Sequence, residues 1–228
     1  MENIKIQNIL LAFLAYRAVK IISPSEIKSV EGKVCLVTGA GGGLGLSIIR
    51  ELKKRKCGKL ILWDIKQEAL NVAGKEAMNN FETKVVDLSK KNEIYEAIKE
   101  VKYMPDFVFN VAGIVLGKYL SENSDQVDEL TFQVNTMAPL YIMKAFLPLF
   151  EKRGSGHFIN VASAAAFVGA AGMVTYSGSK AALMMMSQAL TSELVQRNSP
   201  IKVTCVCPSH FETPLFSGFK YWGSVFLG

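Results

Sequence analysis

Short apolar runs alternate with longer stretches of helical spacing along this 228-residue chain, beginning at Gly32. The apolar runs predict strands over residues 33–38, 59–63, 83–87, 107–111, 156–161 and 201–206. Helical spacing predicts helices over residues 44–56, 126–150 and 176–196. Strands that are apolar throughout are buried on both faces, and parallel strands need crossover helices between them. The pattern therefore predicts an α/β fold built on a parallel sheet.

The stretch over residues 4–22 is strongly apolar, but polar side chains interrupt it. Its uninterrupted part, residues 9–16, is shorter than the ~20 apolar residues of an unbroken membrane span. Lys5 and Lys20 belong to a thin stripe of polar or small residues at spacings of three and four, which is typical of a helix lying at a membrane interface. The alternative is a helix that packs on its own domain or on a partner subunit.

Two parts of the chain are therefore predicted. Residues 1–29 form a hydrophobic anchor helix with a linker, and residues 30–228 form the folded domain. We find no internal repeat and no low-complexity segment that would divide the second part further.

Composition narrows the class of protein. Half of the residues are hydrophobic (50%) and 20% are charged, which is typical of a globular chain. The net charge of +6 comes without a dense Lys/Arg run among aromatic residues, which argues against nucleic-acid binding. That charge suits an anionic cofactor and an anionic membrane surface equally well. The four cysteines show no C-x-x-C spacing, so we expect no metal site and a reducing location that faces the cytosol.

A glycine-rich turn, TGAGGGLG from Thr38 to Gly45, joins the first predicted strand to the first predicted helix. Glycines let the backbone turn sharply and approach a ligand closely. The helix that follows presents its free N–H groups and the positive end of its dipole to a phosphate. A glycine turn without a ligand is the alternative, but the position between strand and helix favours phosphate binding.

Two aspartates follow neighbouring strands. Asp64 ends the second predicted strand, where a carboxylate accepts hydrogen bonds from the adenosine ribose and repels a 2′-phosphate. This position favours NAD over NADP, although Lys66 nearby would weaken the preference and Asp64 could instead cap a loop. Asp87, at the end of the third strand, is a candidate acceptor for the adenine amino group or a helix N-cap.

Tyr176 and Lys180 lie four residues apart in the sequence YSGSK and share one face of a predicted helix. A free phenol has a pKa of ~10 and is a poor base at neutral pH. A neighbouring ammonium would lower the pKa of the Tyr176 phenol, which could then take the proton of an alcohol as its carbon loses hydride. Ser163, just past the fifth predicted strand, could hold the substrate oxygen.

Several motifs occur in order and together resemble the short-chain dehydrogenase/reductase family. They are TGAGGGLG, the sequence NVAG at Asn110 to Gly113, Ser163 thirteen residues before Tyr176, and YSGSK. The resemblance implies a Rossmann-like, doubly wound parallel sheet in three α/β/α layers. It makes residues 30–228 a dinucleotide-binding catalytic domain.

The family pattern also implies roles for particular residues. The catalytic tetrad would be Asn135, Ser163, Tyr176 and Lys180. The cofactor-binding residues would be Gly39, Gly43, Leu44, Gly45, Asp64, Asp87, Leu88, Asn110, Ala112, Gly113, Tyr176, Lys180, Pro208 and Thr213.

A narrower likeness rests on the sequences LILWDI at 60–65, KAFLP at 144–148, VASAA at 161–165 and CVCP at 205–208. These resemble a branch with retinol dehydrogenases and lipid-droplet 17-beta-hydroxysteroid dehydrogenases. The likeness implies a lipid alcohol or its carbonyl as substrate. It also implies attachment through residues 4–22 to the endoplasmic reticulum or lipid droplets, and a homodimer is compatible with it.

Three departures from the family pattern stand out. Val111 replaces a second asparagine, and Ser209 replaces a glycine after Pro208. The chain also ends at Gly228, whereas the family continues through a substrate-covering segment and a seventh strand, so we expect a fold truncated before its last strand. The alternative function is therefore a non-catalytic, membrane-bound NAD(H)-binding or scaffold protein. A hydrolase is disfavoured because the chain has no G-x-S-x-G motif.

Overall fold

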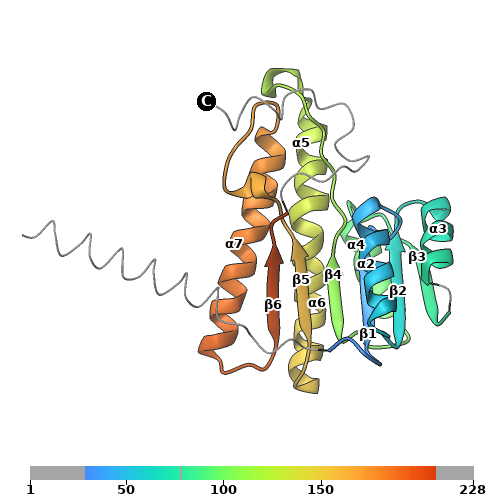
Figure 1. Ribbon diagram of the computed structural model, residues 1–228. Coiled ribbons are helices and arrows are strands. Elements are labelled where there is room, and N and C mark those ends of the chain that lie inside the picture. Colours follow the sequence, from blue (N-terminus) through green and yellow to red (C-terminus); the bar gives the residue numbers. More distant parts are fainter. Residues whose placement is uncertain (1–28, 78, 209–228) are drawn as a thin grey trace, which may run out of the picture.

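The computed structural model describes residues 29–77 and 79–208, which form a six-stranded parallel sheet (Figure 1). The strand order is β3-β2-β1-β4-β5-β6, so the chain winds outward from β1 in both directions. The predicted Rossmann-like parallel sheet is therefore confirmed. The strands are β1 Val34–Thr38, β2 Lys59–Asp64, β3 Phe81–Val85, β4 Phe107–Asn110, β5 His157–Val161 and β6 Lys202–Val206.

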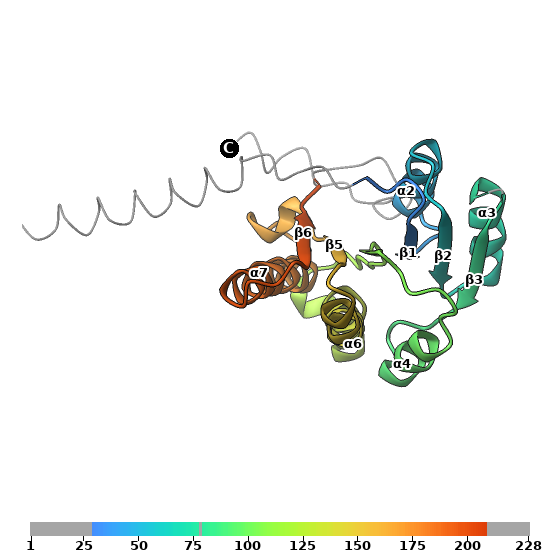
Figure 2. The same cartoon turned by 90° about the horizontal axis from the view of Figure 1, so that it is seen from below.

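Helices cover both faces of the sheet. Figure 2 shows α2 and α3 on one face, and α4, α6 and α7 on the other, which gives the three α/β/α layers. The helices are α2 Gly43–Lys54, α3 Gln67–Ala77, α4 Lys91–Lys99, α5 Asp125–Phe132, α6 Ala138–Arg153 and α7 Val174–Gln196, with the π-helix η2 at Gln133–Met137 and short 3₁₀ turns η1 at Leu120–Glu122 and η3 at Ala164–Ala166.

The helix predicted over residues 126–150 is in fact three elements, α5, η2 and α6. Pro139, near the start of α6, lacks the N–H group that an α-helix would direct to the carbonyl of Asn135. The chain instead makes a wider turn, in which the Ala138 N–H donates to the Gln133 carbonyl. This turn places Asn135 at a break in the helical hydrogen-bond pattern.

Two other boundaries differ from expectation. Strand β3 begins at Phe81 and ends at Val85, two residues earlier than the predicted strand, because the apolar run continues into the connection to α4. Helices α3 and α4 were not located from the sequence. Their apolar faces are narrow, with buried residues such as Leu70 in α3 and Ile94 in α4 separated by polar ones.

Side chains that alternate along the strands form a hydrophobic cluster on each face of the sheet. Leu36 and Phe158 face α4, α6 and α7. The ring centroids of Phe158 and of Phe150 in α6 lie 4.9 Å apart. Cys35 and Leu62 face α2 and α3. Because both faces are packed, the strands are fixed relative to one another and the loops at their carboxyl ends start from a rigid base.

The predicted anchor at residues 4–22 and most of the C-terminal segment, with Thr213, lie outside the described residues. Among the helices that the structure does describe, none is both long and apolar enough to cross a membrane.

Candidate active site

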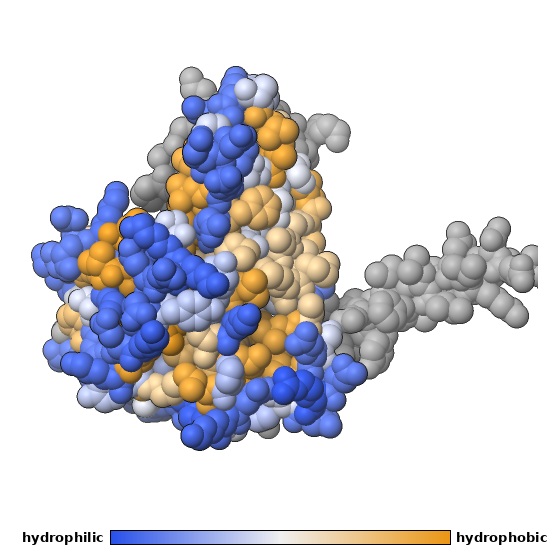
Figure 3. Space-filling model, turned by 180° about the vertical axis from the view of Figure 1, so that it is seen from behind, coloured by the Kyte–Doolittle hydropathy of each residue, from blue (hydrophilic) through white to orange (hydrophobic). Residues whose placement is uncertain are grey.

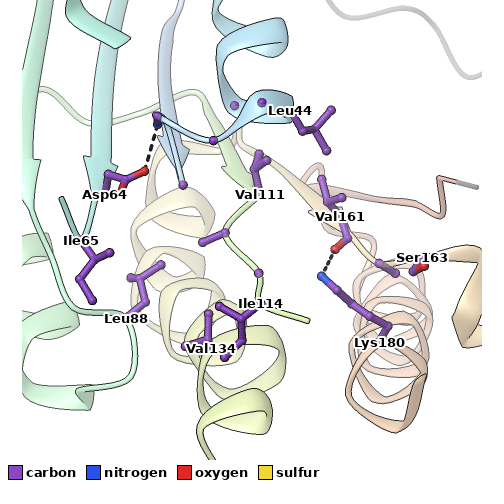
Figure 4. Close-up of a pocket in the computed structure, with 18 of the residues that line it drawn as sticks. Leu44, Asp64, Ile65, Leu88, Val111, Ile114, Val134, Val161, Ser163 and Lys180 are labelled. Atoms are coloured by element: carbon purple, nitrogen blue, oxygen red, sulfur yellow. Dashed lines mark hydrogen bonds between the residues drawn. The ribbon is translucent and has the colours of Figure 1, made fainter. Parts of the chain in front are cut away.

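A cavity of about 450 Å³ lies at the carboxyl ends of the strands, where the strand order reverses between β1 and β4 (Figure 4). This is where open α/β sheets bind ligands, and the volume is typical of a small-molecule site. Predicted site residues that line it are Gly39, Gly43, Leu44, Gly45, Asp64, Asp87, Leu88, Ala112, Gly113, Ser163, Tyr176, Lys180 and Pro208.

The glycine turn forms one wall of this cavity. Gly39 has a φ of +63°, and a Cβ atom on Gly45 would lie only 2.2 Å from the Gly39 carbonyl oxygen, so both positions need glycine. Helix α2 begins next to the cavity, and its N-cap residue, Gly42, provides no side-chain cap. The first N–H groups of α2 therefore suit the pyrophosphate of a dinucleotide.

Asp64 and Asp87 lie on the same side of the cavity. The Asp64 carboxylate accepts the Gly41 N–H at 3.0 Å (Figure 4) and the Lys66 N–H at 3.2 Å, which fixes the end of β2 to the glycine turn. Burial opposes ionisation of Asp87, but hydrogen bonds from Ser89 and Lys90 outweigh it and lower the pKa of the Asp87 carboxyl. Lys90, and not Asp87, is the N-cap residue of α4.

Ser163, Tyr176 and Lys180 meet at the opposite wall, where β5 ends and α7 begins. Ser163 caps η3, and its hydroxyl accepts the Ala165 N–H at 3.1 Å. Lys180 is buried, and its Nζ donates to the Val161 carbonyl at 2.8 Å (Figure 4). The same nitrogen is 5.9 Å from the ring centroid of Tyr176.

The expectation that Lys180 lowers the pKa of Tyr176 is not met in this structure. Burial raises the pKa of the Tyr176 phenol, and a hydrogen bond with Ser163 only partly offsets the increase. Burial also lowers the pKa of Lys180 to about 8. Both groups are withdrawn from water, and the Lys180 ammonium is directed at the Val161 carbonyl, so desolvation is the largest cause of both pKa shifts.

Asn135 and Asn110 lie behind the wall and are not among the residues that line the cavity. Asn135 is buried, accepts the Ile114 N–H at 2.8 Å and donates to the Ile114 carbonyl at 2.9 Å. Asn110 donates to the side chain of Asn160 at 2.8 Å in the middle of the sheet. Both asparagines therefore hold the connection after β4 from inside the fold.

Thr38 does not line the cavity, but its hydroxyl accepts the Val111 and Ala112 N–H groups at 3.0 and 3.2 Å, which positions the loop after β4.

Other residues line the cavity without having been identified from the sequence. Three of them, Gly41, Gly42 and Val111, lie within the TGAGGGLG and NVAG sequences but were not singled out as site residues. The full set of missed lining residues is mostly apolar: Gly41, Gly42, Ile65, Val86, Val111, Ile114, Val134, Val161 and Ala162.

A doubly wound sheet with a glycine-rich turn facing a Ser-Tyr-Lys cluster is the arrangement of a nicotinamide-dependent oxidoreductase. The chain belongs to the short chain dehydrogenase family, whose model matches residues 33–222. The predicted resemblance is thereby confirmed.

Named relatives fall in the expected branch. Human estradiol 17-beta-dehydrogenase 11 is 37% identical over 202 residues, which cover 86% of this chain and 67% of that protein. Retinol dehydrogenase 10-A of Danio rerio is 32% identical over 88% of this chain and 67% of that protein. The chain thus spans about two thirds of the length of these relatives.

Solved structures agree with this assignment. A short chain dehydrogenase/reductase from Burkholderia phymatum in complex with NAD has a TM-score of 0.77, 25% identity, and coverage of 83% of this chain and 69% of that one. A short chain dehydrogenase from Burkholderia cenocepacia in complex with NADP has a TM-score of 0.74, 28% identity, and coverage of 83% and 77%. The protein is an NAD(P)-dependent oxidoreductase of alcohols and carbonyls, and the scaffold alternative is not favoured.

The burial of Lys180 predicts a specific pH dependence of stability. In the unfolded chain the amine stays protonated up to a pKa of 10.5, whereas in the folded chain it loses its proton near 8. The unfolded state thus binds more protons between these values, and folding becomes more favourable as pH rises. From about pH 7.5 to about pH 9.5, the unfolding free energy of the wild type should increase by about 2 kcal/mol relative to Lys180→Met.

Urea unfolding of both proteins at each pH measures this difference. Lys202→Met, which changes an exposed lysine on β6, is the control and should track the wild type. A parallel response of wild type and Lys180→Met would show that the buried lysine keeps its ordinary pKa.

Proposed function

We propose that the protein is an NAD-dependent dehydrogenase that interconverts a hydrophobic alcohol and its carbonyl, with Tyr176 as the acid/base. The observation that carries this proposal is the convergence of Ser163, Tyr176 and Lys180 on one wall of the cavity, opposite the glycine turn. The two walls divide the tasks of the site, since one takes phosphates and the other takes the reacting oxygen.

The site residues divide the chemistry between them. The bound nicotinamide supplies the hydride acceptor or donor. The Ser163 hydroxyl holds the substrate oxygen, and the Tyr176 phenol takes the proton from that oxygen during oxidation or returns it during reduction. The Lys180 ammonium lies close enough to favour the phenolate form of Tyr176 and also binds the ribose next to the nicotinamide.

Apolar side chains around the reacting end support a hydrophobic substrate. Ile114 and Val134 line the cavity (Figure 4), and Leu116 and Phe167 on the adjoining loops are exposed, Phe167 by 67%. Exposed large hydrophobic residues beside a cavity are typical of a site for an apolar ligand. The relatives named for estradiol and retinol point to the same class, a steroid, retinoid or other lipid alcohol.

The Tyr176→Phe variant tests the acid/base role. Removal of the phenolic oxygen should lower kcat for retinol or estradiol by a factor of about 10³, because general acid–base catalysis contributes 10²–10⁴-fold. Binding of NADH, followed by its fluorescence, should stay within about twofold, because a phenol contributes little to dinucleotide affinity. Tyr103→Phe, at an exposed tyrosine, is the control, and retention of wild-type kcat by Tyr176→Phe would exclude the assigned base.

NAD is proposed as the preferred cofactor because of Asp64. Its carboxylate is anchored by the Gly41 and Lys66 N–H groups at the adenosine end of the cavity, so it presents a fixed negative charge to the ribose. A fixed carboxylate accepts hydrogen bonds from two ribose hydroxyls and repels a 2′-phosphate. The side chain of Lys66 is the residue that would weaken this preference.

Asp64→Ala should therefore reduce the ratio of kcat/KM for NAD to kcat/KM for NADP by about tenfold or more, since a charge-assisted hydrogen bond contributes ~1.5–3 kcal/mol. Steady-state kinetics with both cofactors measure the ratio. Glu68→Ala removes a nearby exposed carboxylate that does not line the cavity and should leave the ratio unchanged. An unaltered ratio in Asp64→Ala would remove Asp64 from this role.

Attachment to the endoplasmic reticulum membrane or to lipid droplets, with the catalytic domain facing the cytosol, is the second part of the proposal. Its support is the apolar sequence of residues 4–22, interrupted by lysines that can reach the interface, and the hydrophobic substrate class. We also include a homodimer, supported by the apolar side chains that gather on the face shown in Figure 3. Exposed large hydrophobic residues on the helices include Leu130 in α5, Leu149 in α6 and Met185 in α7.

Deletion of residues 1–22 tests the attachment. The full chain should float with phosphatidylcholine vesicles in a density gradient, and the shortened chain should stay at the bottom, because the apolar stretch supplies most of the interfacial affinity. The circular dichroism spectrum of the shortened chain controls for folding. Flotation of both chains to the same extent would refute an anchor in residues 4–22.

A further inference from the structure

Ser179 lies between Tyr176 and Lys180 on α7 and points away from the cavity. It is fully buried and does not line the cavity. Its hydroxyl donates to the Tyr176 carbonyl at 2.7 Å and accepts from the Asn135 Nδ2 at 3.0 Å. One hydroxyl thus connects the helix that carries the Tyr-Lys pair with the π-helix η2.

The Ser179 hydroxyl and the two backbone groups of Ile114 together fix the orientation of the Asn135 side-chain amide. The single proton of the Ser179 hydroxyl is committed to the Tyr176 carbonyl, so its oxygen can only accept from Asn135. Only the NH₂ end of the amide can face Ser179, and Oδ1 must then face the Ile114 N–H, where it accepts at 2.8 Å. With Ser179 in place the reversed amide would bring two acceptors together.

The Asn135 Oδ1 reaches the same place as the Lys180 amine. A Cβ atom added to Gly113 would lie 3.2 Å from Asn135 Oδ1 and 3.1 Å from Lys180 Nζ. The oxygen, which is the negative end of the amide dipole, and the lysine nitrogen therefore lie on the same side of Gly113. An oxygen in this position favours the charged ammonium form, which burial alone disfavours.

We propose that Ser179 is a positioning residue for the dehydrogenase reaction, which together with the Ile114 backbone holds the Asn135 amide in place and through it the environment of Lys180 and Tyr176. It also holds η2 against α7, because the Thr136 hydroxyl donates to the Ser179 carbonyl at 2.9 Å. The kinetic part of this inference rests on the function proposed above.

The chain offers a closely matched control at Ser187, two helical turns further along α7. This buried hydroxyl also donates to a carbonyl of its own helix, that of Leu183 at 2.7 Å, and also accepts from an asparagine Nδ2, that of Asn160 at 2.8 Å. Its carbonyl also accepts a threonine hydroxyl, that of Thr191 at 2.8 Å. Its asparagine lies within the sheet and not beside the cavity, so the two serines share a structural role but differ in their relation to the site.

Ser179→Ala should lower kcat on the order of tenfold, because a small misplacement of reacting groups is costly, and should leave KM for the cofactor within about twofold. The ascending limb of the kcat/KM profile should move to higher pH, because a less favoured ammonium stabilises the Tyr176 phenolate less. Ser187→Ala should have a comparable loss of melting temperature with wild-type kcat and pH profile. Equal kinetic effects of the two variants, or none in Ser179→Ala, would overturn the proposal.

A measurement without turnover separates failure of this inference from failure of the proposed function. The ionisable groups around Lys180 include Tyr176 on α7 and Cys205 and Cys207 at β6. NMR titration of ¹³Cε-labelled lysine should give a lower pKa for Lys180 in Ser179→Ala than in the wild type or in Ser187→Ala. An unchanged Lys180 titration would exclude the proposed amide effect even if no tested alcohol is oxidised.

A folding defect is handled by a second variant. If Ser179→Ala does not fold, Ser179→Cys takes its place, because a thiol is similar in size but a weaker donor and acceptor. The kinetic comparison with Ser187→Ala and the NMR titration of Lys180 then decide the outcome in the same way.

Discussion

The hydrogen bonding of β1 to parallel neighbours on both sides is the constraint from which the site follows. Strand β1 pairs with β2 along its whole length and with β4 over residues Cys35–Val37. The connection after β1 leads to β2 on one side, and the connection after β4 leads to β5 on the other side. The two loops therefore diverge, and their separation opens the cavity at the carboxyl ends of the strands. The glycine turn lies on one side of this opening and the Ser-Tyr-Lys cluster on the other.

Burial sets the electrostatics of that cluster. Lys180 is buried, and its Nζ donates to the Val161 carbonyl at the end of β5. The same burial that lowers the pKa of Lys180 raises that of Tyr176, so burial shifts both groups toward their neutral forms.

The sequence was sufficient for features that depend on local chemistry. Apolar strand runs located all six strands of the described sheet, and the glycine turn and the Tyr-Lys spacing led to the correct family. It did not reveal features that depend on what surrounds a residue. The direction of the Tyr176 pKa shift results from burial, and the positions of Asn110 and Asn135 behind the cavity wall result from packing. The apolar lining, including Val134, carries no local signal at all.

The break between α5 and α6 depends both on a residue that is visible in the sequence and on the surroundings of that residue in the fold. Pro139 is visible in the sequence, but its consequence is spatial, because the missing N–H widens the helix at Asn135 and turns this residue toward Ile114. At this break, Asn135 bonds both the backbone of Ile114 and the hydroxyl of Ser179. The side chains of Asn135 and Ser179 behind the cavity thus bond one another and the neighbouring backbone. A wall held in this way is pre-organised, as the proton transfer proposed for Tyr176 would require.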